Sequence, residues 1–265
     1  MPNLLYKNAS FHYSDQGNGP VLLLLHGFLE DLSMWDDIVN SFKQTHRVIC
    51  LDLLGHGKTE NLGYIHTMEA QAQLIHFLLD HLDISQCSIV GHSMGGYIAL
   101  AFTELFPEMV QGICLMNSTA LADTEEKKHN RDRGINAVKQ NHKIFIRLAI
   151  PNLFSEENRS VFTSEIKSIT QSALKMSQQG IIAALEGMKV RKDQSHLLGK
   201  KEFPILMIIG RKDPALDYDS LIDQVNKYAL NHVIFDDGHM SHIENISALK
   251  MTLSNWYPIL KNVSP

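Results

Sequence analysis

The sequence contains few cysteines: Cys50, Cys87 and Cys114 are the only ones among 265 residues. Each lies in or beside an apolar, strand-like run, and their spacing fits no zinc-binding pattern, so we expect buried, reduced thiols. A long apolar run is missing as well, because none approaches the ~20 residues that a membrane-spanning helix needs. The first residues lack the basic and then apolar segments of a signal peptide. These absences predict a cytoplasmic protein without a membrane partner.

Positive charge is scarce too. The 24 Lys and Arg residues are outnumbered by 29 Asp and Glu, and the net charge of −5 gives no reason to expect a nucleic-acid partner. Fourteen histidines invite a metal hypothesis, but only His239 and His242 lie suitably close, and no third ligand has a convincing spacing. We therefore expect neither a metal nor another cofactor. The length suffices for one large domain with an insertion, or for two small ones.

Short apolar runs that fit strands recur along the chain. They are continuous rather than alternating, which is typical of strands buried on both faces of a parallel sheet. They occupy residues 21–25, 48–51, 87–90, 113–116, 204–209 and 232–235. An alternating run at residues 11–14 is typical of an edge strand instead. Helical patterns separate most of these runs, so we expect an α/β fold with a mainly parallel, doubly wound sheet.

The alternation of strand and helix stops in the middle of the chain. From Thr119 to Gly199 helical patterns take over, and strand signals return only at residue 204. We expect this insertion to project from the edge where open α/β sheets place their ligands. The sequence therefore predicts an α/β core of residues 1–118 and 201–265 and a helical cap of residues 119–200.

The segment from residue 87 to residue 106 joins an apolar strand to an amphipathic helix through Gly91-His92-Ser93-Met94-Gly95. A serine in so sharp a turn has a strained backbone, and the flanking glycines remove side chains that would collide with the strand and helix. This G-x-S-x-G pattern predicts that the Ser93 hydroxyl is an exposed nucleophile and that the Met94 amide faces a developing oxyanion. A glycine-rich turn with an incidental serine is the alternative.

Four further motifs, each after a predicted strand, complete a pattern that resembles the α/β-hydrolase family. They are His26-Gly27-Phe28, Asp52 with Gly55-His56-Gly57, Gly210-Arg211-Lys212-Asp213, and Gly238-His239. The resemblance covers nearly all of the chain outside the cap. It implies a sheet of the α/β-hydrolase type and a catalytic triad of Ser93, Asp213 and His239, in that chain order. It also implies an oxyanion hole made by the amides of Phe28 and Met94.

Two of the triad positions have rivals. Some family members carry the acid after the strand that follows the elbow helix, but this sequence has Asn117-Ser118 there, which favours Asp213. His242 is only three residues from His239 and is the rival base. His92, beside the serine, is expected to be a hydrogen-bonded structural residue.

The resemblance implies a serine hydrolase that acts on an ester or thioester of a small molecule. Ser93 would attack the carbonyl carbon, His239 would act as base and then as acid, and water would clear the acyl-enzyme. Haloalkane dehalogenases and epoxide hydrolases of this fold are excluded, because they place an aspartate at the elbow. Two alternatives stay open. One is C–C cleavage or elimination with the same triad, as in ring-fission-product hydrolases and the menaquinone-pathway lyase, and the other is a non-catalytic receptor.

Charge divides unevenly between the predicted core and cap. Between Thr119 and Gly199, thirteen Lys and Arg stand against nine Asp and Glu, a net of +4, whereas the rest of the chain carries eleven against twenty, or −9. Opposite signs on two parts of a chain can steer an anion into the cleft between them. We therefore expect a carboxylate-bearing substrate, with Arg131, Arg133 and Arg147 as candidate ligands. Solvated helix faces are the alternative, and the substrate's identity and the oligomeric state stay open.

Overall fold

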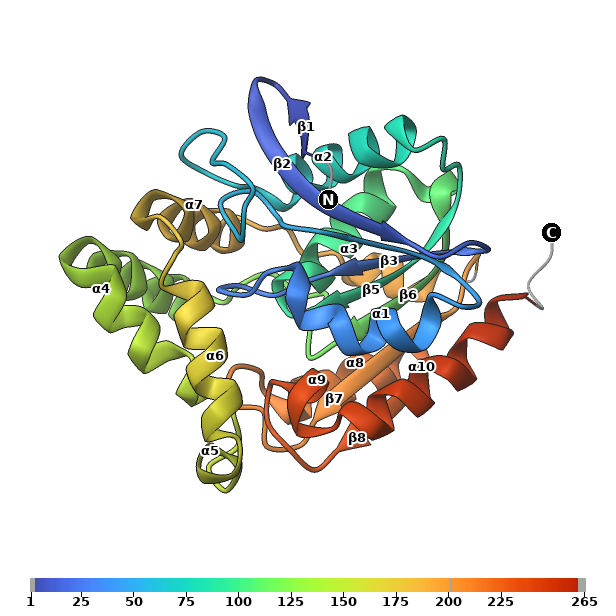
Figure 1. Cartoon of the computed structure of the whole chain (residues 1–265). Coiled ribbons are helices and arrows are strands. Elements are labelled where there is room, and N and C mark those ends of the chain that lie inside the picture. Colours follow the sequence, from blue (N-terminus) through green and yellow to red (C-terminus); the bar gives the residue numbers. More distant parts are fainter. Residues whose placement is uncertain (1–2, 201, 262–265) are drawn as a thin grey trace.

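One mixed sheet forms the centre of the molecule (Figure 1). The computed structural model describes residues 3–200 and 202–261, and within them eight strands lie in the order β1-β2-β4-β3-β5-β6-β7-β8. The strands from β4 to β8 in that order are parallel, and β1 and β2 are antiparallel to their neighbours, so the predicted mainly parallel sheet is confirmed. The strands are β1 (Asn3–Tyr6), β2 (Ala9–Gln16), β3 (Val21–Leu25), β4 (Arg47–Leu51), β5 (Cys87–His92), β6 (Val110–Met116), β7 (Ile205–Gly210) and β8 (Asn231–Phe235).

Alternate residues of the central strands belong to two hydrophobic cores. In β3, Leu23 and Leu25 share a core with α2, α3 and α8, whereas Leu22 and Leu24 share the other core with α1 and α10. Burying one leucine contributes about 1.5–3 kcal/mol, so a strand covered on both faces is continuously apolar. The helices around the sheet are η1 (Leu32–Trp35), α1 (Asp36–Phe42), α2 (Met68–His81), α3 (Met94–Leu105), η2 (Pro107–Met109), α8 (Tyr218–Tyr228), α9 (Ser241–Glu244) and α10 (Ile246–Lys261).

The run at residues 11–14 does not lie at an edge of the sheet. It belongs to β2, which pairs with β1 on one side and with β4 on the other. The four-residue strand β1 folds back on β2 and takes the outer position, with Leu4 opposite Phe11. The prediction of an edge strand at residues 11–14 is therefore wrong.

Residues 119–200, called the cap below, contain helices and turns and no strand in the described structure. In Figure 1 the helices α4 to α7 form a group beside the sheet, at the left of the view. The amide of His66, before α2, donates to the Ala183 carbonyl of α7 (2.9 Å), which fastens the cap to the rest of the chain. The cap elements are α4 (Glu125–Ala149), η3 (Pro151–Leu153), α5 (Asn158–Val161), α6 (Thr163–Ala173), α7 (Gln178–Lys189) and η4 (Ser195–Gly199).

The helix α4 is kinked at Asn141, where φ is −162° and ψ is 92°. The Asn141 side chain accepts a hydrogen bond from the Ile144 amide (3.1 Å) and so caps the second half of the helix. None of the helices in residues 3–200 and 202–261 combines the length and the apolar character that crossing a membrane requires.

Candidate active site

The strand β5 turns sharply into α3 at Ser93. The Ser93 backbone has φ 50° and ψ −112°, a strained conformation, and its N–H donates to the Met116 carbonyl of the neighbouring strand (2.9 Å). A Cβ atom at position 91 would lie 2.4 Å from the Gly95 carbonyl oxygen, so only glycine fits there. The strand, turn and helix predicted for residues 87–106 are thus present, with Ser93 half-buried where the helix begins and Met94 as its first residue.

A buried carboxylate and a buried imidazole face each other at the ends of the next strands. Asp213 follows β7, His239 follows β8, and Nδ1 of His239 lies 2.7 Å from Oδ2 of Asp213. Because a carboxylate can only accept a hydrogen bond, Nδ1 carries the proton and Nε2 is left as an acceptor. Burial opposes the ionisation of Asp213, but the attraction of His239 and the hydrogen bonds to the carboxylate outweigh it and lower the pKa of Asp213.

Further hydrogen bonds hold this pair in place. Asn117, which follows β6, donates from Nδ2 to Oδ2 of Asp213 and to the Gly238 carbonyl (both 3.1 Å). The amide of His239 donates to the carbonyl of Leu153, a cap residue (2.8 Å). Asn117, at the alternative position for the acid, therefore holds the Asp213 carboxylate in place. The loop that contains His239 is hydrogen-bonded to the cap.

A second carboxylate joins the same loop to the cap. Oε1 of Glu244 accepts hydrogen bonds from the amide of Ser155 (3.0 Å) and from Nδ2 of Asn158 (2.9 Å), both in the cap. Its other oxygen, Oε2, accepts from the amide of Met240 (3.0 Å). One side chain thereby fixes the segment after His239 to the cap.

Ser93 and His239 line one cavity of about 490 Å³ between the core and the cap. Phe28 lies at the same end, after β3, and the remaining apolar wall consists of Tyr97, Phe145, Leu153, Leu185, Met188, Pro214, Ala215 and Leu216. In the described structure the Ser93 hydroxyl makes no hydrogen bond with His239, and such bonds often form only when substrate is bound. The fold therefore brings Phe28, Ser93 and His239 together from three loops.

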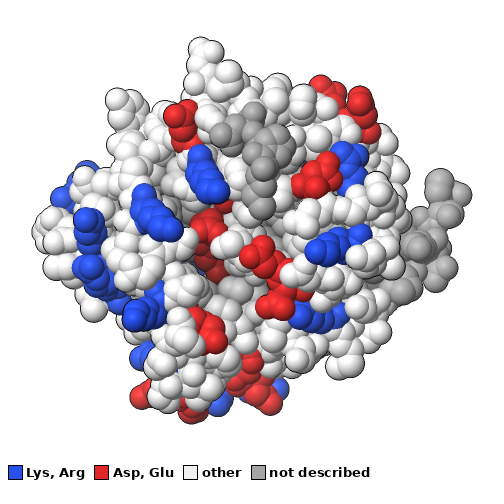
Figure 2. Space-filling view, viewed as in Figure 1, with Lys and Arg blue, Asp and Glu red and all other residues white. Residues whose placement is uncertain are grey.

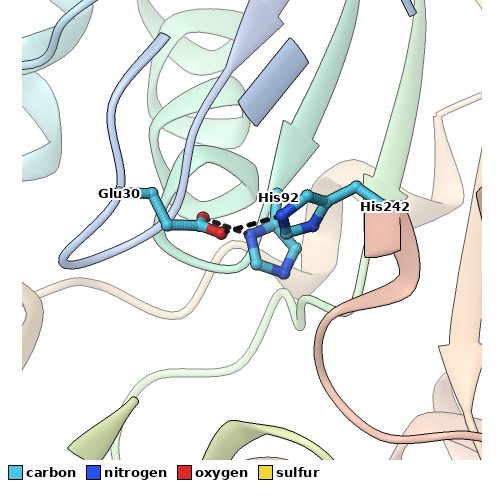
Figure 3. A group of neighbouring side chains, drawn as sticks. All are labelled: Glu30, His92 and His242. Carbon is cyan, nitrogen blue, oxygen red and sulfur yellow. Dashed lines mark hydrogen bonds and ion pairs between the residues drawn. The ribbon is translucent and has the colours of Figure 1, made fainter. Parts of the chain in front are cut away.

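The rival base His242 belongs to a different group, which Figure 3 shows. Its Nε2 lies 3.3 Å from Oε1 of Glu30, and Nδ1 of His92 lies 2.7 Å from Oε2 of the same carboxylate. All three side chains are buried. Burial lowers the pKa of His242 to about 4, and the nearby His92 and His239 add to that effect. His242 is therefore a neutral partner of Glu30 at pH 7 rather than of Asp213.

Glu30 was not among the residues predicted from the sequence. Nothing near it in the chain marks it as functional, because its partner His92 lies 62 residues later. Its position could have indicated a role, because Glu30 lies two residues after Phe28 in the loop after β3. The predicted parallel sheet brings that loop beside the end of β5. His92 is hydrogen-bonded, as predicted.

The group of Glu30, His92 and His242 also has a composition that could bind a metal, with one ligand atom of each within 4.8 Å of the others. However, Nδ1 of His92 and Oε2 of Glu30 are 2.7 Å apart, whereas two atoms bound tetrahedrally to one zinc ion at about 2.1 Å lie about 3.4 Å apart. The other nitrogen of His92 lies 2.9 Å from the carbonyl of His239. A shared proton therefore explains this geometry better than a metal ion does.

The first half of α4, with the residues before it, forms a polar wall of the cavity. Asp123 on this wall is buried between Arg131 and Arg191, with Nη1 of Arg191 2.6 Å from Oδ1 of Asp123. Lys127 lies on the same wall, and among the described residues no hydrogen bond or ion pair involves its ammonium group. Burial and then the nearby Arg191 lower the pKa of Lys127. The cavity thus contains a partly buried cation that Asp123 and Asp213 attract, but with which no described residue forms a direct ion pair.

The distribution of charge on the cap differs from the sequence-based expectation in its details. Figure 2 shows several lysines and arginines at the left of the view, over the cap, and carboxylates at the centre and at the upper and lower edges. Of the three arginines proposed as ligands, only Arg131 lines the cavity, and Asp123 already pairs with it. Arg133 and Arg147 are exposed on other faces of α4 and do not line the cavity, so the expectation was wrong for them.

Comparison with known proteins gives matches over the whole fold. A family model described as the α/β hydrolase fold matches residues 20–140. A thermophilic esterase from Thermogutta terrifontis, solved with malate bound, is 29% identical and has a TM-score of 0.89, with 95% of this chain and 94% of that chain covered. The (E)-2-((N-methylformamido)methylene)succinate hydrolase of Acinetobacter baylyi is 24% identical over 262 residues, 95% of each protein.

Other curated relatives match only a part of the chain. An uncharacterized protein of Mycobacterium tuberculosis is 36% identical over 102 residues, which are 38% of this chain. The chain spans about 30% of the length of that relative. The order of the sheet, the family model and the near-complete overlap with a 29% identical esterase agree that the chain has the α/β-hydrolase fold.

Proposed function

We propose that this protein is a serine hydrolase that cleaves an ester or thioester of a small molecule. Ser93 is the nucleophile, His239 the general base and acid, and Asp213 the residue that orients and stabilises the imidazole. The observation that carries the proposal is the 2.7 Å contact between Asp213 and His239, at the end of a cavity that Ser93 and His239 both line. The 29% identical esterase, which overlaps almost the whole chain, supports the same reaction class.

In the proposed reaction, Ser93 Oγ attacks the substrate carbonyl carbon while its proton passes to Nε2 of His239. The resulting oxyanion accepts hydrogen bonds from the amides of Phe28 and Met94. When the tetrahedral intermediate collapses, the leaving alcohol or thiol takes the proton from Nε2, and the acyl group remains on Ser93. Water then attacks the acyl-enzyme, with His239 again as base, and releases the acid.

The cap supplies the walls that select the substrate. We propose residues 119–200 as this unit, with residues 1–118 and 201–265 as the core. The apolar wall includes Phe145 from α4 and Leu185 and Met188 from α7, whereas Ser93 and His239 come from the core. A cytoplasmic location remains part of the proposal. The three cysteines are free and buried, which is common for proteins of a reducing compartment.

The substrate carries a carboxylate that Lys127 binds. Lys127 lines the cavity and has no partner among the described residues, and a substrate anion would give this partly buried cation a counter-ion. Asp123 already forms ion pairs with two arginines and attracts Lys127 without a direct ion pair to it. The bound malate of the Thermogutta esterase and the succinate-derived substrate of the Acinetobacter hydrolase are both dicarboxylates, which supports the same class here.

Lys127→Met is expected to raise KM for monoethyl succinate by about ten-fold or more, because a hydrogen bond to a charged group contributes about 1.5–3 kcal/mol. For the neutral diethyl succinate, kcat/KM should change by less than about two-fold, because this ester has no carboxylate for Lys127 to bind. Steady-state kinetics at low and high salt provide the measurement, and salt should weaken the preference for the monoester.

Arg133→Met is the matched control for Lys127→Met. It removes the same charge from the same helix, but at an exposed position outside the cavity. If the two variants lose the monoester preference equally, the effect is a general one of cap charge. An unchanged preference in Lys127→Met contradicts the proposed carboxylate site.

Fluorophosphonate labelling tests the proposed reaction itself. We expect the phosphonyl group on the peptide that contains Ser93, identified by mass spectrometry, and turnover of short p-nitrophenyl esters by the unlabelled protein. Labelling without ester turnover would favour C–C cleavage or elimination with the same triad. Neither labelling nor turnover would favour the non-catalytic receptor.

A further inference from the structure

One buried network touches three of the four loops that carry the proposed catalytic groups, and Figure 3 shows its side chains Glu30 and His92. Oε2 of Glu30 accepts a hydrogen bond from the amide of Gly27 (2.8 Å), within the loop that contains Phe28. The same oxygen binds Nδ1 of His92 (2.7 Å), the residue before Ser93. Nε2 of His92 then contacts the main-chain carbonyl of His239 (2.9 Å). The chain of contacts therefore runs from the Phe28 loop through the elbow to the histidine loop.

The hydrogen-bond partners of His92 determine its protonation. A main-chain carbonyl can only accept a hydrogen bond, so Nε2 of His92 carries a proton. Nδ1 faces a carboxylate oxygen that also accepts from the amide of Gly27, which fits an ionised Glu30 and a proton on Nδ1. With both nitrogens protonated, His92 is an imidazolium, and it forms an ion pair with Glu30.

The environment of the pair supports this assignment. Burial opposes both charges, but the attraction between Glu30 and His92 outweighs it, so the pKa of His92 is raised and the pKa of Glu30 is lowered. The other titratable groups that face the network are His26 after β3, His242 in α9, and Asp213 through His239. His242 adds a second, neutral partner to Glu30.

The local sequence leaves room for the ion pair. A Cβ atom at position 27 would lie 2.5 Å from Oε2 of Glu30 and 2.7 Å from Nδ1 of His92. Glycine at this position therefore allows the two charged groups to approach the backbone that donates to them.

We propose that Glu30 and His92 form a buried ion pair that positions the oxyanion loop, the nucleophile elbow and the His239 loop relative to one another. The positioning role rests on the proposed function, since it is that function which makes these three loops catalytic. Charge-assisted hydrogen bonds are roughly twice as strong as neutral ones, which suits a device that must fix loops from three separate strands. The pair binds the main chain of His239 and leaves its ring free for Asp213 and Ser93.

Nitrogen-15 NMR of histidine-labelled protein tests the ion pair without any substrate. In the wild type, one histidine should keep both ring nitrogens protonated as the pH rises above the ordinary histidine pKa of 6.5, and this signal should be absent from His92→Gln. In Glu30→Gln, which keeps the shape of the side chain, His92 should become neutral. A neutral His92 in the wild type would overturn the proposal, whatever the enzymatic activity proves to be.

Kinetics of the same variants test the positioning role. Because a misplacement of about 1 Å can cost 10²-fold, kcat of Glu30→Gln should fall by about ten- to a hundred-fold. KM should stay within about three-fold, because neither side chain is proposed to hold the ground-state substrate. The rate of fluorophosphonate labelling should fall in parallel with kcat, and the double variant Glu30→Gln/His92→Gln should lose no more than the worse single variant.

Asp15→Asn is the matched control for these kinetics. It breaks the Asp15–Arg47 ion pair (2.7 Å), which lies where β4 begins, at the opposite edge of the sheet from Ser93. Its kcat should equal that of the wild type. If Glu30→Gln also keeps its kcat and loses only thermal stability, the pair is structural and the positioning role is wrong. A wild type that neither labels nor turns over esters contradicts the proposed function instead, and the NMR result still decides the ion pair.

The stability of the fold should depend on pH through the same pair. The pKa of Glu30 is lowered, so its contribution is present above its ordinary value of 4.5 and is lost as the pH falls through the folded value. The pKa of His92 is raised, so its contribution is complete below its ordinary value of 6.5 and is lost as the pH rises through the folded value. Urea unfolding should therefore show the largest difference between wild type and Glu30→Gln between about pH 4.5 and 6.5. A difference that does not vary from pH 5 to pH 9 would contradict the ion pair.

Discussion

Replacement of Ser93 by alanine is expected to lower kcat for ester hydrolysis by about four orders of magnitude or more. The change removes the oxygen that would form the acyl-enzyme, and among the described residues that line the cavity no other hydroxyl lies at the turn into α3. Fluorophosphonate labelling should disappear with it. The measurement is kcat for a short p-nitrophenyl ester, together with the mass of the protein after exposure to the label.

The fold of Ser93→Ala should remain that of the wild type. In the described structure the Ser93 hydroxyl donates no hydrogen bond that alanine would lose, and position 93 is half-buried, so Tm should move by no more than a few degrees. Circular dichroism and Tm are the controls. Retention of more than a few per cent of wild-type turnover by a correctly folded variant would show that Ser93 is not the nucleophile.

The second large effect is expected from His239→Ala, which should be nearly as damaging as the loss of Ser93. Nδ1 of His239 faces Asp213 and its ring lines the cavity, so alanine removes both the base and the acid of the proposed mechanism. His242→Ala should have a much milder effect on kcat, because His242 faces Glu30 and does not line the cavity. Activities are compared per folded molecule, since both side chains are buried and either change can lower stability.

Asp213→Asn completes this series. An asparagine keeps the shape of the side chain but can present a donor to Nδ1, so the imidazole loses its preferred tautomer. We expect a loss smaller than that of the serine or the histidine variant, because Asp213 does not touch the substrate. If His242→Ala proves worse than His239→Ala, the base has been assigned to the wrong histidine.

Much of the fold could be predicted because its strands are buried on both faces. The runs at residues 21–25 and 113–116 are continuously apolar, so both faces of each strand must be covered. They form β3 and the end of β6 in the structure. The outer part of the sheet was harder to predict, because a four-residue strand such as β1 is too short to show a recognisable hydrophobic pattern. Its presence changed the run at residues 11–14 from an expected edge into an interior strand.

The positions of Ser93, Asp213 and His239 could be predicted for a topological reason. Parallel strands end at the same edge of a sheet, so residues that follow β5, β7 and β8 meet there although they are far apart in the chain. Their catalytic roles remain predictions. Glu30 could not be found in this way, because its importance depends on side-chain directions and not on the order of the strands.

The polar wall of the cap was only partly accessible to sequence analysis. Lys127, Asn130, Arg131 and Gly134 follow the i, i+3, i+4, i+7 spacing of one helix face, and all four line the cavity. Arg133 and Arg147 do not share that face. The net charge summed over the cap does not describe this wall, which includes Asp123 and Glu126 as well as Lys127 and Arg131. The helical period is what separates the cavity residues of α4 from the exposed ones.

The contacts of the His239 and Glu244 segment with the cap limit how this protein can be recombined with its relatives. The His239 amide donates a hydrogen bond to the Leu153 carbonyl. The Glu244 carboxylate accepts hydrogen bonds from Ser155 and Asn158. A chimaera that lacked these partners would leave the buried His239 amide and the half-buried Glu244 carboxylate without them, at a cost of up to about 1–3 kcal/mol for the buried group. Cap exchanges intended to alter the substrate range should therefore keep residues 153–158 of this protein, so that these hydrogen bonds are preserved.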